Sequence, residues 1–538
     1  MKRKFLIFAL IIFGFTMLSI FMMEKTDIIG LGNVDMDAVC KDEDGRIVLS
    51  WSRLPYPCFY KVETYSHTTG ILKEEPDSHL VTSAFTFETS YEVPSTAIPM
   101  FYRVTAYGMF GKLAGPTEPV ENPRYSEPLV PVSIFHYTES NPASPMPYLV
   151  WHVVPDAVCY ELELLSAPPE KEGGIKLSSK NHLFSTRQIF TNGYQADLRK
   201  YVSMGSIYWR VRALGLHHEP IGEFSKAEPL LIDKNEPIPN YPLINNFDYM
   251  PDFQQPLYPA YAWIPMHGVK EYEVELLIHP PQEPNGKEPD PERIWYEKSL
   301  DTCSCYDEYS RPYAGEYYWR VRGIDKDGKT IGRYSDAEEF IVKDPGDRVY
   351  AAVFGDSVVH GGGALSYAPC SLEYNFSTYL DFPALNLGKS GDTSNTSLER
   401  FDEDVLRYRP KNLIILTGCN SLRAEDIKAK DIIADLEGIR KKCEKNGIRP
   451  IFLTLMPLNP KNIKSAFQTD TDPDWEDKMD EVNDYIREQP AYVDIETFFY
   501  DSKHEVMDYH MAIDGLHPDL KGKMLIGEAV NRRKDLLR

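Results

Sequence analysis

The chain has 538 residues, of which 42% are hydrophobic and 26% are charged. This ordinary globular composition excludes a disordered or fibrous protein, and the length predicts three or four domains of roughly 150 residues each. The 81 acidic and 58 basic side chains leave a net charge of −23, so nucleic acid is excluded as an expected partner because its phosphates would be repelled. Eight cysteines are too few for a fold built on disulfides.

The N-terminal segment predicts a membrane anchor. Three basic residues at 2–4 precede an uncharged apolar run over 5–23. As a helix this run is roughly 28 Å long, enough to cross the hydrocarbon core, and the basic cluster should stay in the cytoplasm. We therefore expect residues 1–30 to be the signal anchor of a single-pass cell-membrane protein whose bulk is extracytoplasmic. A cleaved signal peptide, which would make the protein secreted, is the alternative.

The segment that follows contains three repeats of about 105 residues, a domain-sized unit. Each repeat has a Trp, a Tyr nine residues later, and then an Arg-Val pair. The positions are Trp51, Tyr60 and Arg103 in the first repeat, Trp151, Tyr160 and Arg210 in the second, and Trp263, Tyr272 and Arg320 in the third. Apolar and polar residues alternate around these positions, which predicts β-strands with one buried face.

These repeats resemble fibronectin type III domains. The resemblance rests on the early-strand Trp, the Tyr-x-Val/Leu-Glu strand and the Tyr-x-Arg-Val strand that precedes a polar hairpin. It implies three all-β sandwiches, over residues 31–127, 128–236 and 237–344. These sandwiches would serve as a stalk, or they would bind proteins or glycans at the cell surface. We expect the three Trp side chains to fill the sandwich cores.

After residue 345 the pattern changes to strand–helix alternation. Short apolar runs predict buried parallel strands, and amphipathic segments predict helices. The strands are expected at 349–354, 412–417 and 450–455, and the helices at 431–447 and 474–489. This alternation predicts an α/β three-layer sandwich with a mainly parallel sheet over residues 345–538, with its site at the carboxyl ends of the strands.

Four polar motifs fall at such strand ends or in loops. Ser357 in "FGDSVVHGGG" directly follows the first strand, where a nucleophile can be exposed. Gly391 in "NLGKSGDTS" permits close backbone approach, and Asn420 in "LTGCNSL" offers an amide donor. Asp514 and His517 in "DGLHPD" are three residues apart, so both side chains can project from one side of a turn.

At these residues the chain resembles the SGNH hydrolases, also called GDSL esterases and lipases, over about residues 347–538. The resemblance implies that Ser357 is the nucleophile, His517 the general base and Asp514 the group that orients the imidazole. It also implies an oxyanion hole formed by the backbone N–H groups of Ser357 and Gly391 and the side chain of Asn420. All four motifs lie within 345–538, so we expect this segment to be active alone.

The chemistry of these residue types agrees with the resemblance. A Ser hydroxyl becomes a useful nucleophile when a nearby His takes its proton, and the reaction requires no metal or other cofactor. The expected function is an extracytoplasmic serine esterase that works through an acyl-enzyme. We expect its substrate to be an acetylated carbohydrate of the cell envelope or its surroundings, because the segment after the nucleophile offers no long apolar stripe for a fatty chain. The alternatives are an O-acyltransferase or lysophospholipase using the same triad, and a non-catalytic surface-binding protein.

Overall fold

The computed structural model divides the chain into two compact units, Met1–Ser126 and Glu127–Arg538, and each is described by itself. The described residues are 36–43, 46–54, 58–67, 78–93, 100–108, 111–117, 120–121, 129–247, 255–299, 303–344, 346, 348–365 and 371–537. The anchor predicted over 5–23 lies outside these residues and stays a prediction. Among the residues that are described, no helix is both long and apolar enough to cross a membrane.

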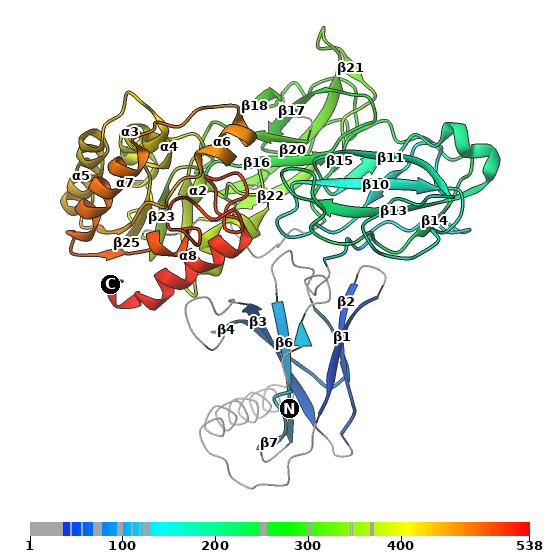
Figure 1. Cartoon of the computed structure of the whole chain (residues 1–538), viewed down its shortest axis with the longest axis horizontal. Helices are drawn as coiled ribbons and strands as arrows, with labels where there is room; N and C mark the ends of the chain where they lie inside the picture. Colours follow the sequence, from blue (N-terminus) through cyan, green and yellow to red (C-terminus); the bar gives the residue numbers. More distant parts are fainter. Residues whose placement is uncertain are drawn as a thin grey trace, which may run out of the picture. The chain divides into compact units, whose positions relative to one another are not determined.

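The first unit contains two antiparallel sheets (Figure 1), in the orders β1-β2-β5 and β4-β3-β6-β7, with β8 paired to β6. The strands are β1 (Ala38–Glu43), β2 (Arg46–Trp51), β3 (Phe59–His67), β4 (Ser78–Thr86), β5 (Ser90–Val93), β6 (Met100–Gly108), β7 (Gly111–Ala114) and β8 (Val120–Glu121). Apolar side chains of both sheets are buried, among them Leu49 of β2 and Val104 of β6, and Trp51 of β2 packs against Tyr60 of β3.

The second unit begins with two further β-domains, each with one larger and one smaller antiparallel sheet. The second repeat has the orders β11-β10-β13-β14 and β12-β9, and the third has β18-β17-β20-β21, with β22 on β20, and β15-β16-β19. The strands are β9 (Tyr148–Val150), β10 (Cys159–Leu165), β11 (His182–Ile189), β12 (Gly193–Gln195), β13 (Ser206–Leu214), β14 (Glu228–Leu231), β15 (Leu243–Ile244), β16 (Ala260–Ile264), β17 (Glu271–Leu277), β18 (Trp295–Ser299), β19 (Ser304–Tyr306), β20 (Gly315–Ile324), β21 (Thr330–Ile331) and β22 (Glu338–Val342), and a 3-10 helix, η2 (Arg199–Met204), precedes β13. The predicted β-domains are therefore present, whereas their membership of the fibronectin family stays a prediction.

The repeated Trp and Tyr make the same contact in all three repeats. The pairs are Trp51–Tyr60, Trp151–Tyr160 and Trp263–Tyr272, with ring centroids 5.3, 5.2 and 5.4 Å apart. Each phenol oxygen also accepts the backbone N–H of the residue three positions after the Trp, over 3.2, 3.0 and 2.8 Å. The three indoles are buried, as predicted. The nine-residue spacing thus preserves a core contact and the hydrogen bond that satisfies the buried phenol.

The prediction that the strands bury only one face is wrong for the central strands of the second and third repeats. Every residue of β10 is buried, and so are all residues of β17 after the first. The outward Glu163 is buried because it pairs with Arg210 at 2.7 Å, and Arg210 also donates to the carbonyl of Lys176 in the segment that covers this face. Glu275 and Arg320 form the equivalent pair in the third repeat, at 2.8 Å. Alternation of charged and apolar residues therefore predicts a solvent-exposed face where these strands have a second buried face made of Glu–Arg pairs.

The C-terminal domain is built on a five-stranded parallel sheet in the order β24-β23-β25-β26-β27. Its strands are β23 (Ala351–Gly355), β24 (Leu385–Gly388), β25 (Asn412–Leu416), β26 (Arg449–Leu453) and β27 (Tyr492–Val493). Strand β24, the next strand in the chain, pairs with one edge of β23, and β25 pairs with the other edge. The loops that follow β23 and β25 therefore lead away in opposite directions. Ligands bind at such a switch point in open parallel sheets.

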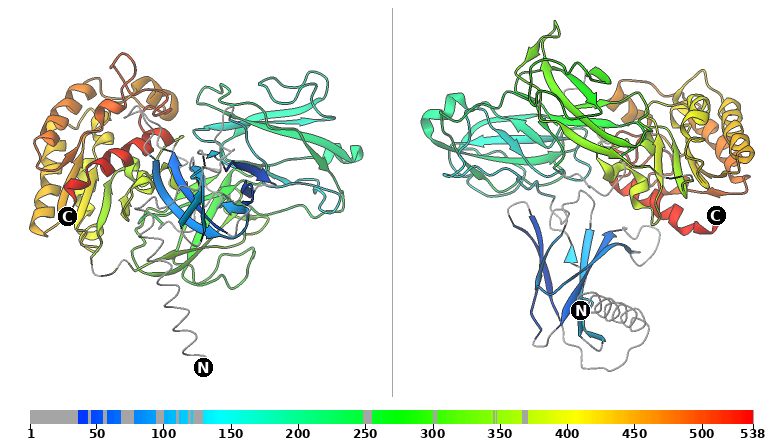
Figure 2. Two further views of the ribbon diagram at one scale, coloured as in Figure 1. Left: turned by 90° about the horizontal axis from the view of Figure 1, so that it is seen from below. Right: turned by 180° about the vertical axis from the view of Figure 1, so that it is seen from behind.

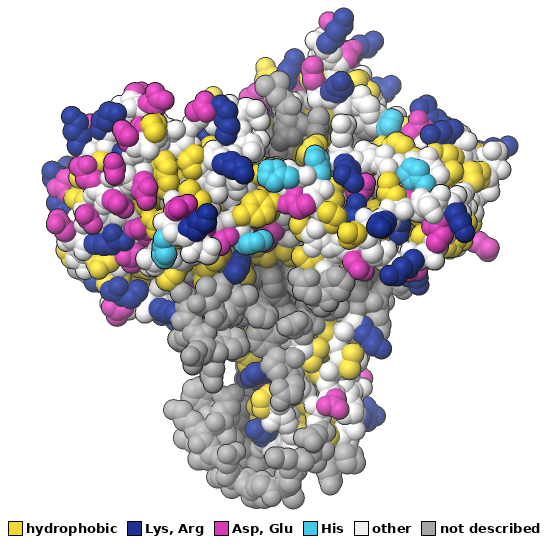
Figure 3. Space-filling model, in the orientation of Figure 1, with side chains coloured by type: hydrophobic (Ala, Val, Ile, Leu, Met, Phe, Trp, Pro, Cys, Tyr) yellow, Lys and Arg dark blue, Asp and Glu magenta, His cyan; other side chains and the backbone are white. Residues whose placement is uncertain are grey.

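Helices cover both faces of this sheet (Figures 1 and 2), which gives the predicted three layers. Helices α3, α5 and α7 pack side by side, whereas α8 packs with η4 and η5. The helices are α2 (Ser357–His360), η4 (Leu372–Tyr374), η5 (Phe376–Tyr379), α3 (Ser394–Asp404), α4 (Cys419–Arg423), α5 (Ala429–Lys445), α6 (Pro460–Phe467), α7 (Trp475–Arg487), η6 (Glu496–Phe498), α8 (Leu520–Arg532) and η7 (Lys534–Leu536). On the face shown in Figure 3, acidic and basic side chains are interspersed over α5 and α7.

The predicted strands and helices of this domain match β23, β25, β26, α5 and α7 within a few residues. Strand β24 was not predicted because it is short and contains the polar Asn386. Helix α8 was not predicted because it is buried almost all round and therefore has no polar stripe.

We expect Arg210→Ala to lower the free energy of unfolding by about 3 kcal/mol, because it leaves the carboxylate of Glu163 buried without its guanidinium partner. Arg199→Ala is the matched control in the same domain. Its pair with Asp197 is also 2.7 Å long, but the Arg199 side chain is 62% exposed, so its loss should cost less than about 1 kcal/mol. Urea unfolding followed by tryptophan fluorescence checks this, and equal losses in the two variants would contradict it.

Candidate active site

The candidate nucleophile lies in a tight turn at the end of β23. A Cβ atom at Gly355 would lie 1.7 Å from the carbonyl oxygen of Leu416 in β25, so only glycine allows the two strands this approach. Asp356 follows and caps α2, its Oδ1 accepting the N–H of Val358 over 3.0 Å. Ser357 is therefore the first residue of a short helix at the carboxyl edge of the sheet.

The structure brings the three predicted triad residues together. Ser357 Oγ lies 2.8 Å from His517 Nε2, and His517 Nδ1 lies 2.8 Å from Asp514 Oδ2. The other oxygen of Asp514 accepts the backbone N–H groups of Leu516 and His517, each over 2.8 Å. All three triad side chains are buried, so these contacts have little competition from water.

The environment of Asp514 favours its ionised form. Burial by itself would raise the pKa of this carboxyl, but the neighbouring His517 and the two backbone N–H donors outweigh it and hold the pKa below its ordinary value. A carboxylate that stays charged keeps the proton of the imidazole on Nδ1, which leaves Nε2 as the acceptor facing Ser357.

The predicted oxyanion-hole residues lie in the loops that flank this turn. Asn420 Nδ2 donates to the carbonyl of Asp392 over 3.0 Å, which ties the third motif to the loop that carries Gly391. Gly391 has φ +87°, with open space where a side chain would stand. Among the described residues, no hydrogen-bond acceptor is found for the backbone N–H groups of Ser357 and Gly391. These two amides are therefore available donors.

The carboxylate of Asp356 joins the nucleophile turn to the third motif. Its Oδ2 accepts the N–H groups of Gly418 and Cys419, both over 3.3 Å. Burial raises the pKa of Asp356 to about 6. Lys523 of α8, also fully buried, donates to the carbonyl of Val358 over 2.5 Å, and burial lowers the pKa of its ammonium to about 7.

Two cationic side chains that stabilise the loops of the site were not predicted from the sequence. Arg400 of α3 donates to the carbonyl of Gly355 over 2.8 Å and to the carboxylate of Asp392 over 2.5 Å, which fixes both loops of the site. It stands in a polar helix and has no sequence signal. Lys523 does have a signal, because it stands directly before the apolar run 524–526 in α8 and a buried lysine needs a specific partner.

The third repeat contributes a backbone atom to the site. His360, at the end of α2, lies 2.6 Å from the carbonyl oxygen of Tyr258 through Nε2. Its Nδ1 accepts the N–H of Ser390 over 3.2 Å and lies 2.8 Å from the Ser390 hydroxyl. A carbonyl can only accept, so Nε2 carries the proton and the imidazole is neutral. Burial lowers the pKa of His360 to about 4, which agrees with this neutral form.

The second repeat contributes a helix cap. Asp156, in the turn that follows Trp151, accepts through Oδ1 the N–H of Leu520, the first residue of α8, over 3.0 Å. The N–H of Asp156 donates to the Tyr374 hydroxyl over 3.1 Å. The loop that carries His517 leads directly into α8. Residues 345–538 alone would lose these contacts and those of Tyr258, and the expectation that this segment is active alone stays a prediction.

A cavity of about 340 Å³ lies where the second repeat, the third repeat and the C-terminal domain meet. Phe467, which lines it, packs edge-on against the imidazole of His517 with centroids 5.9 Å apart. The second repeat contributes Val153 and Phe190, and the third contributes Tyr306. The lining is mostly apolar and aromatic, as in small-molecule sites. No triad residue is among its lining residues, so Phe467 is the link between this cavity and the general base.

Comparison with known proteins identifies the class of the C-terminal domain. Residues 353–525 match the model of the GDSL-like Lipase/Acylhydrolase family. No curated protein sequence matches the chain. The matched residues contain Ser357, Gly391, Asn420, Asp514 and His517, and this domain is a carboxylic ester hydrolase of the GDSL type.

Similar solved structures include three bacterial hydrolases. A GDSL-like lipase from Bacteroides thetaiotaomicron is 18% identical, with 35% of this chain and 87% of that chain covered and a TM-score of 0.29. A lipase/acylhydrolase from Enterococcus faecalis is 19% identical, with coverages of 35% and 97% and a TM-score of 0.29. A catalytic mutant of an acetylxylan esterase from Geobacillus stearothermophilus is 18% identical, with coverages of 35% and 96% and a TM-score of 0.28.

The neutral state of His360 predicts a pH dependence of stability. Its pKa is depressed in the folded protein, so its contribution is complete above its ordinary pKa of 6.5 and is lost as the pH falls toward 4. We expect the unfolding temperature of the wild type to fall across this window more steeply than that of His360→Gln.

The titration of Asp356 changes the stability in the opposite direction over the same pH range. Its raised pKa favours the folded state below its ordinary value of 3.8, and this contribution is lost as the pH rises through 6. Both proteins keep Asp356, so the difference between their pH profiles isolates His360. Parallel profiles between pH 4 and 6.5 would contradict the neutral assignment.

Proposed function

We propose that this protein is an extracytoplasmic serine esterase that removes short acyl groups, acetyl above all, from carbohydrate. The observation that carries the proposal is the continuous chain of 2.8 Å contacts from Ser357 through His517 to Asp514. The family match of residues 353–525 supports ester hydrolysis as the reaction.

Acylation begins when Ser357 Oγ attacks the ester carbonyl and His517 Nε2 takes the hydroxyl proton. The carboxylate of Asp514 accepts from Nδ1–H and stabilises the imidazolium that forms. The negative oxygen of the tetrahedral intermediate is bound by the N–H groups of Ser357 and Gly391 and by Nδ2 of Asn420. Such preorganised donors are typically worth about 10²–10³ in turnover each.

Collapse of this intermediate breaks the bond to the alcohol oxygen, and His517 gives its proton to that leaving oxygen. Water then attacks the acyl-enzyme, with His517 again taking a proton, and the carboxylic acid is released as Ser357 regains its hydrogen. Every proton moves through Nε2, so this sequence of steps needs no other titrating group.

The cavity beside His517 supports a carbohydrate alcohol. We place the alcohol part of the substrate in this cavity, because the proton donor must face the leaving oxygen and Phe467, which packs against the imidazole, also lines the cavity. Its volume of about 340 Å³ is near the lower end of ligand sites, roughly 300–1,000 Å³. Aromatic walls, including Phe190 and Tyr306, suit a sugar ring, which has apolar C–H faces.

The extracytoplasmic location is supported by the sequence. The basic residues at 2–4 and the apolar run over 5–23 have the order of a signal anchor with its N-terminus in the cytoplasm. Acetylated glycans of the cell envelope or its surroundings would then be within reach of the enzyme.

We expect Ser357→Ala to lower ester hydrolysis by at least about 10⁴-fold while leaving the unfolding temperature unchanged, because a nucleophile is lost without a change in packing. A fluorophosphonate probe should label the wild type and not this variant. Ser371→Ala removes a hydroxyl from a serine of the same domain that lies outside the candidate triad, so it is the matched control and should be labelled like the wild type. Labelling that persists in Ser357→Ala would place the nucleophile elsewhere.

We expect turnover of aryl esters to be highest for acetyl and to fall steadily as the acyl chain lengthens to octanoyl. The segment after Ser357 mixes Gly, Ser, Tyr and Asn and offers no long apolar stripe to cover a fatty chain. Release of acetate from acetylated polysaccharide should accompany this profile. Turnover that rises toward octanoyl without acetate release would favour a lipase-type substrate instead.

A further inference from the structure

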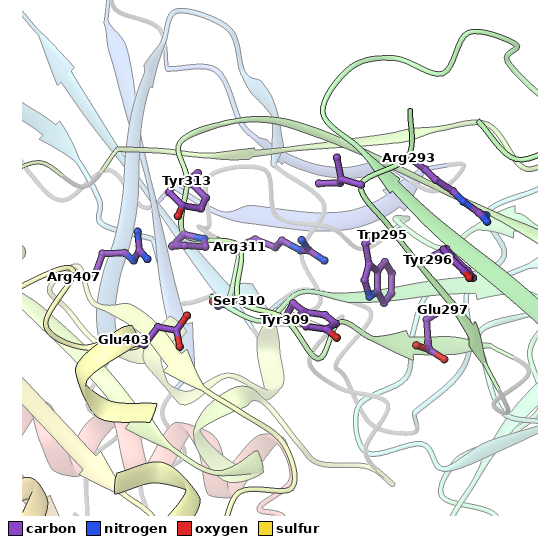
Figure 4. A pocket seen from close by; sticks show the side chains of 12 residues that line it. Arg293, Trp295, Tyr296, Glu297, Tyr309, Ser310, Arg311, Tyr313, Glu403 and Arg407 are labelled. Carbon is purple, nitrogen blue, oxygen red and sulfur yellow. The ribbon is translucent and has the colours of Figure 1, made fainter. Parts of the chain in front are cut away.

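A second cleft, of about 720 Å³, lies between the third repeat and the C-terminal domain. Figure 4 shows its side chains in a row in this view, from Arg407 and Tyr313 at one end to Tyr296 and Arg293 at the other. None of its lining residues lines the cavity beside His517 or belongs to the candidate triad. It is therefore a separate feature that the esterase reaction leaves unexplained.

Three tyrosines of this cleft are exposed to an unusual degree. The exposed fractions of Tyr296, Tyr309 and Tyr313 are 51%, 64% and 67%. Trp295 lies beside them but is buried, with its ring packed against Tyr261 at a centroid distance of 5.8 Å. Large aromatic side chains gathered at a concave surface are typical of a binding site, because a folded protein gains nothing by leaving them in water.

The charges in the cleft favour an uncharged ligand. Arg311 is held by both carboxylate oxygens of Asp307, at 2.7 and 3.0 Å, and Arg293 pairs with Glu273 at 3.1 Å. The guanidinium of Arg407 lies over the ring of Tyr313, 5.1 Å from its centroid. Glu297 and Glu403 also line the cleft, so its positive charge is largely balanced within the protein.

We propose that this cleft binds a neutral, extended oligosaccharide. Pyranose rings present apolar C–H faces that stack on tyrosine rings, and their hydroxyl groups hydrogen-bond to carboxylates and guanidinium groups. Several aromatic side chains along one cleft offer more than one stacking surface to such a chain. The site would hold a glycan chain on the enzyme independently of Ser357, so the proposal stands apart from the esterase function.

The test is isothermal titration of the full-length Ser357→Ala protein with xylohexaose and with cellohexaose, so that binding is measured without turnover. We expect at least one of them to bind saturably, and Tyr309→Ala/Tyr313→Ala to weaken that binding at least about tenfold. Tyr350→Ala, an exposed aromatic of the C-terminal domain that does not line the cleft, is the matched control and should bind as before.

A second measurement separates this site from the catalytic one. In the protein that keeps Ser357, the double tyrosine variant should hydrolyse a small aryl acetate at the wild-type rate. The proposal is overturned if neither oligosaccharide binds at millimolar concentration, or if the double variant binds as tightly as its parent. Tighter binding of an oligogalacturonate than of both neutral probes would also overturn it.

Discussion

The backbones of β23 and β25 approach so closely at Gly355 that a side chain there would overlap the carbonyl of Leu416. This approach lets the carboxylate of Asp356 reach the amides of Gly418 and Cys419, and it starts the nucleophile helix at the carboxyl edge of the sheet. The other loops of the site are arranged around this turn. A bulkier residue at this position would separate the strands and so disperse groups whose chemistry depends on contacts of about 3 Å.

Much of this domain could be predicted because its signals are local. Apolar runs indicated β23, β25 and β26, and a Ser directly after a strand and a Gly indicated an exposed side chain at a strand end. The Asp514–His517 pair is also local, since three residues separate its members. Pairing of Ser357 with His517, which are 160 residues apart, rested on family resemblance and on the rule that parallel strands end at one edge. The 2.8 Å contact agrees with it.

The contacts between domains and the buried ion pairs of the β-domains could not be predicted, because the sequence around these residues gives no sign of them. Asp156 follows a Pro in a turn and has the pattern of an ordinary turn residue, although its carboxylate caps a helix of another domain. Alternation of Glu and Arg with apolar residues in β10 and β13 predicts a solvated face, and only the covering segment shows that Glu163 and Arg210 are buried. Partners distant in the chain decide both cases, and periodicity carries no information about them.

The contact of His360 with Tyr258 has an evolutionary consequence, because a main-chain carbonyl is supplied by every amino acid. Substitutions at position 258 can therefore leave this bond intact, whereas a change of length in the segment cannot. The neighbouring Leu257 is fixed on both sides, since its N–H donates to the carbonyl of Asn386 and its carbonyl accepts from Arg311. One inserted residue would shift the chain by about 3.3–3.6 Å, more than a hydrogen bond tolerates. Homologues that share this architecture should therefore conserve the number of residues here, and the buried side chain of Tyr258 adds a separate constraint because its hydroxyl donates to Asp404 over 2.8 Å.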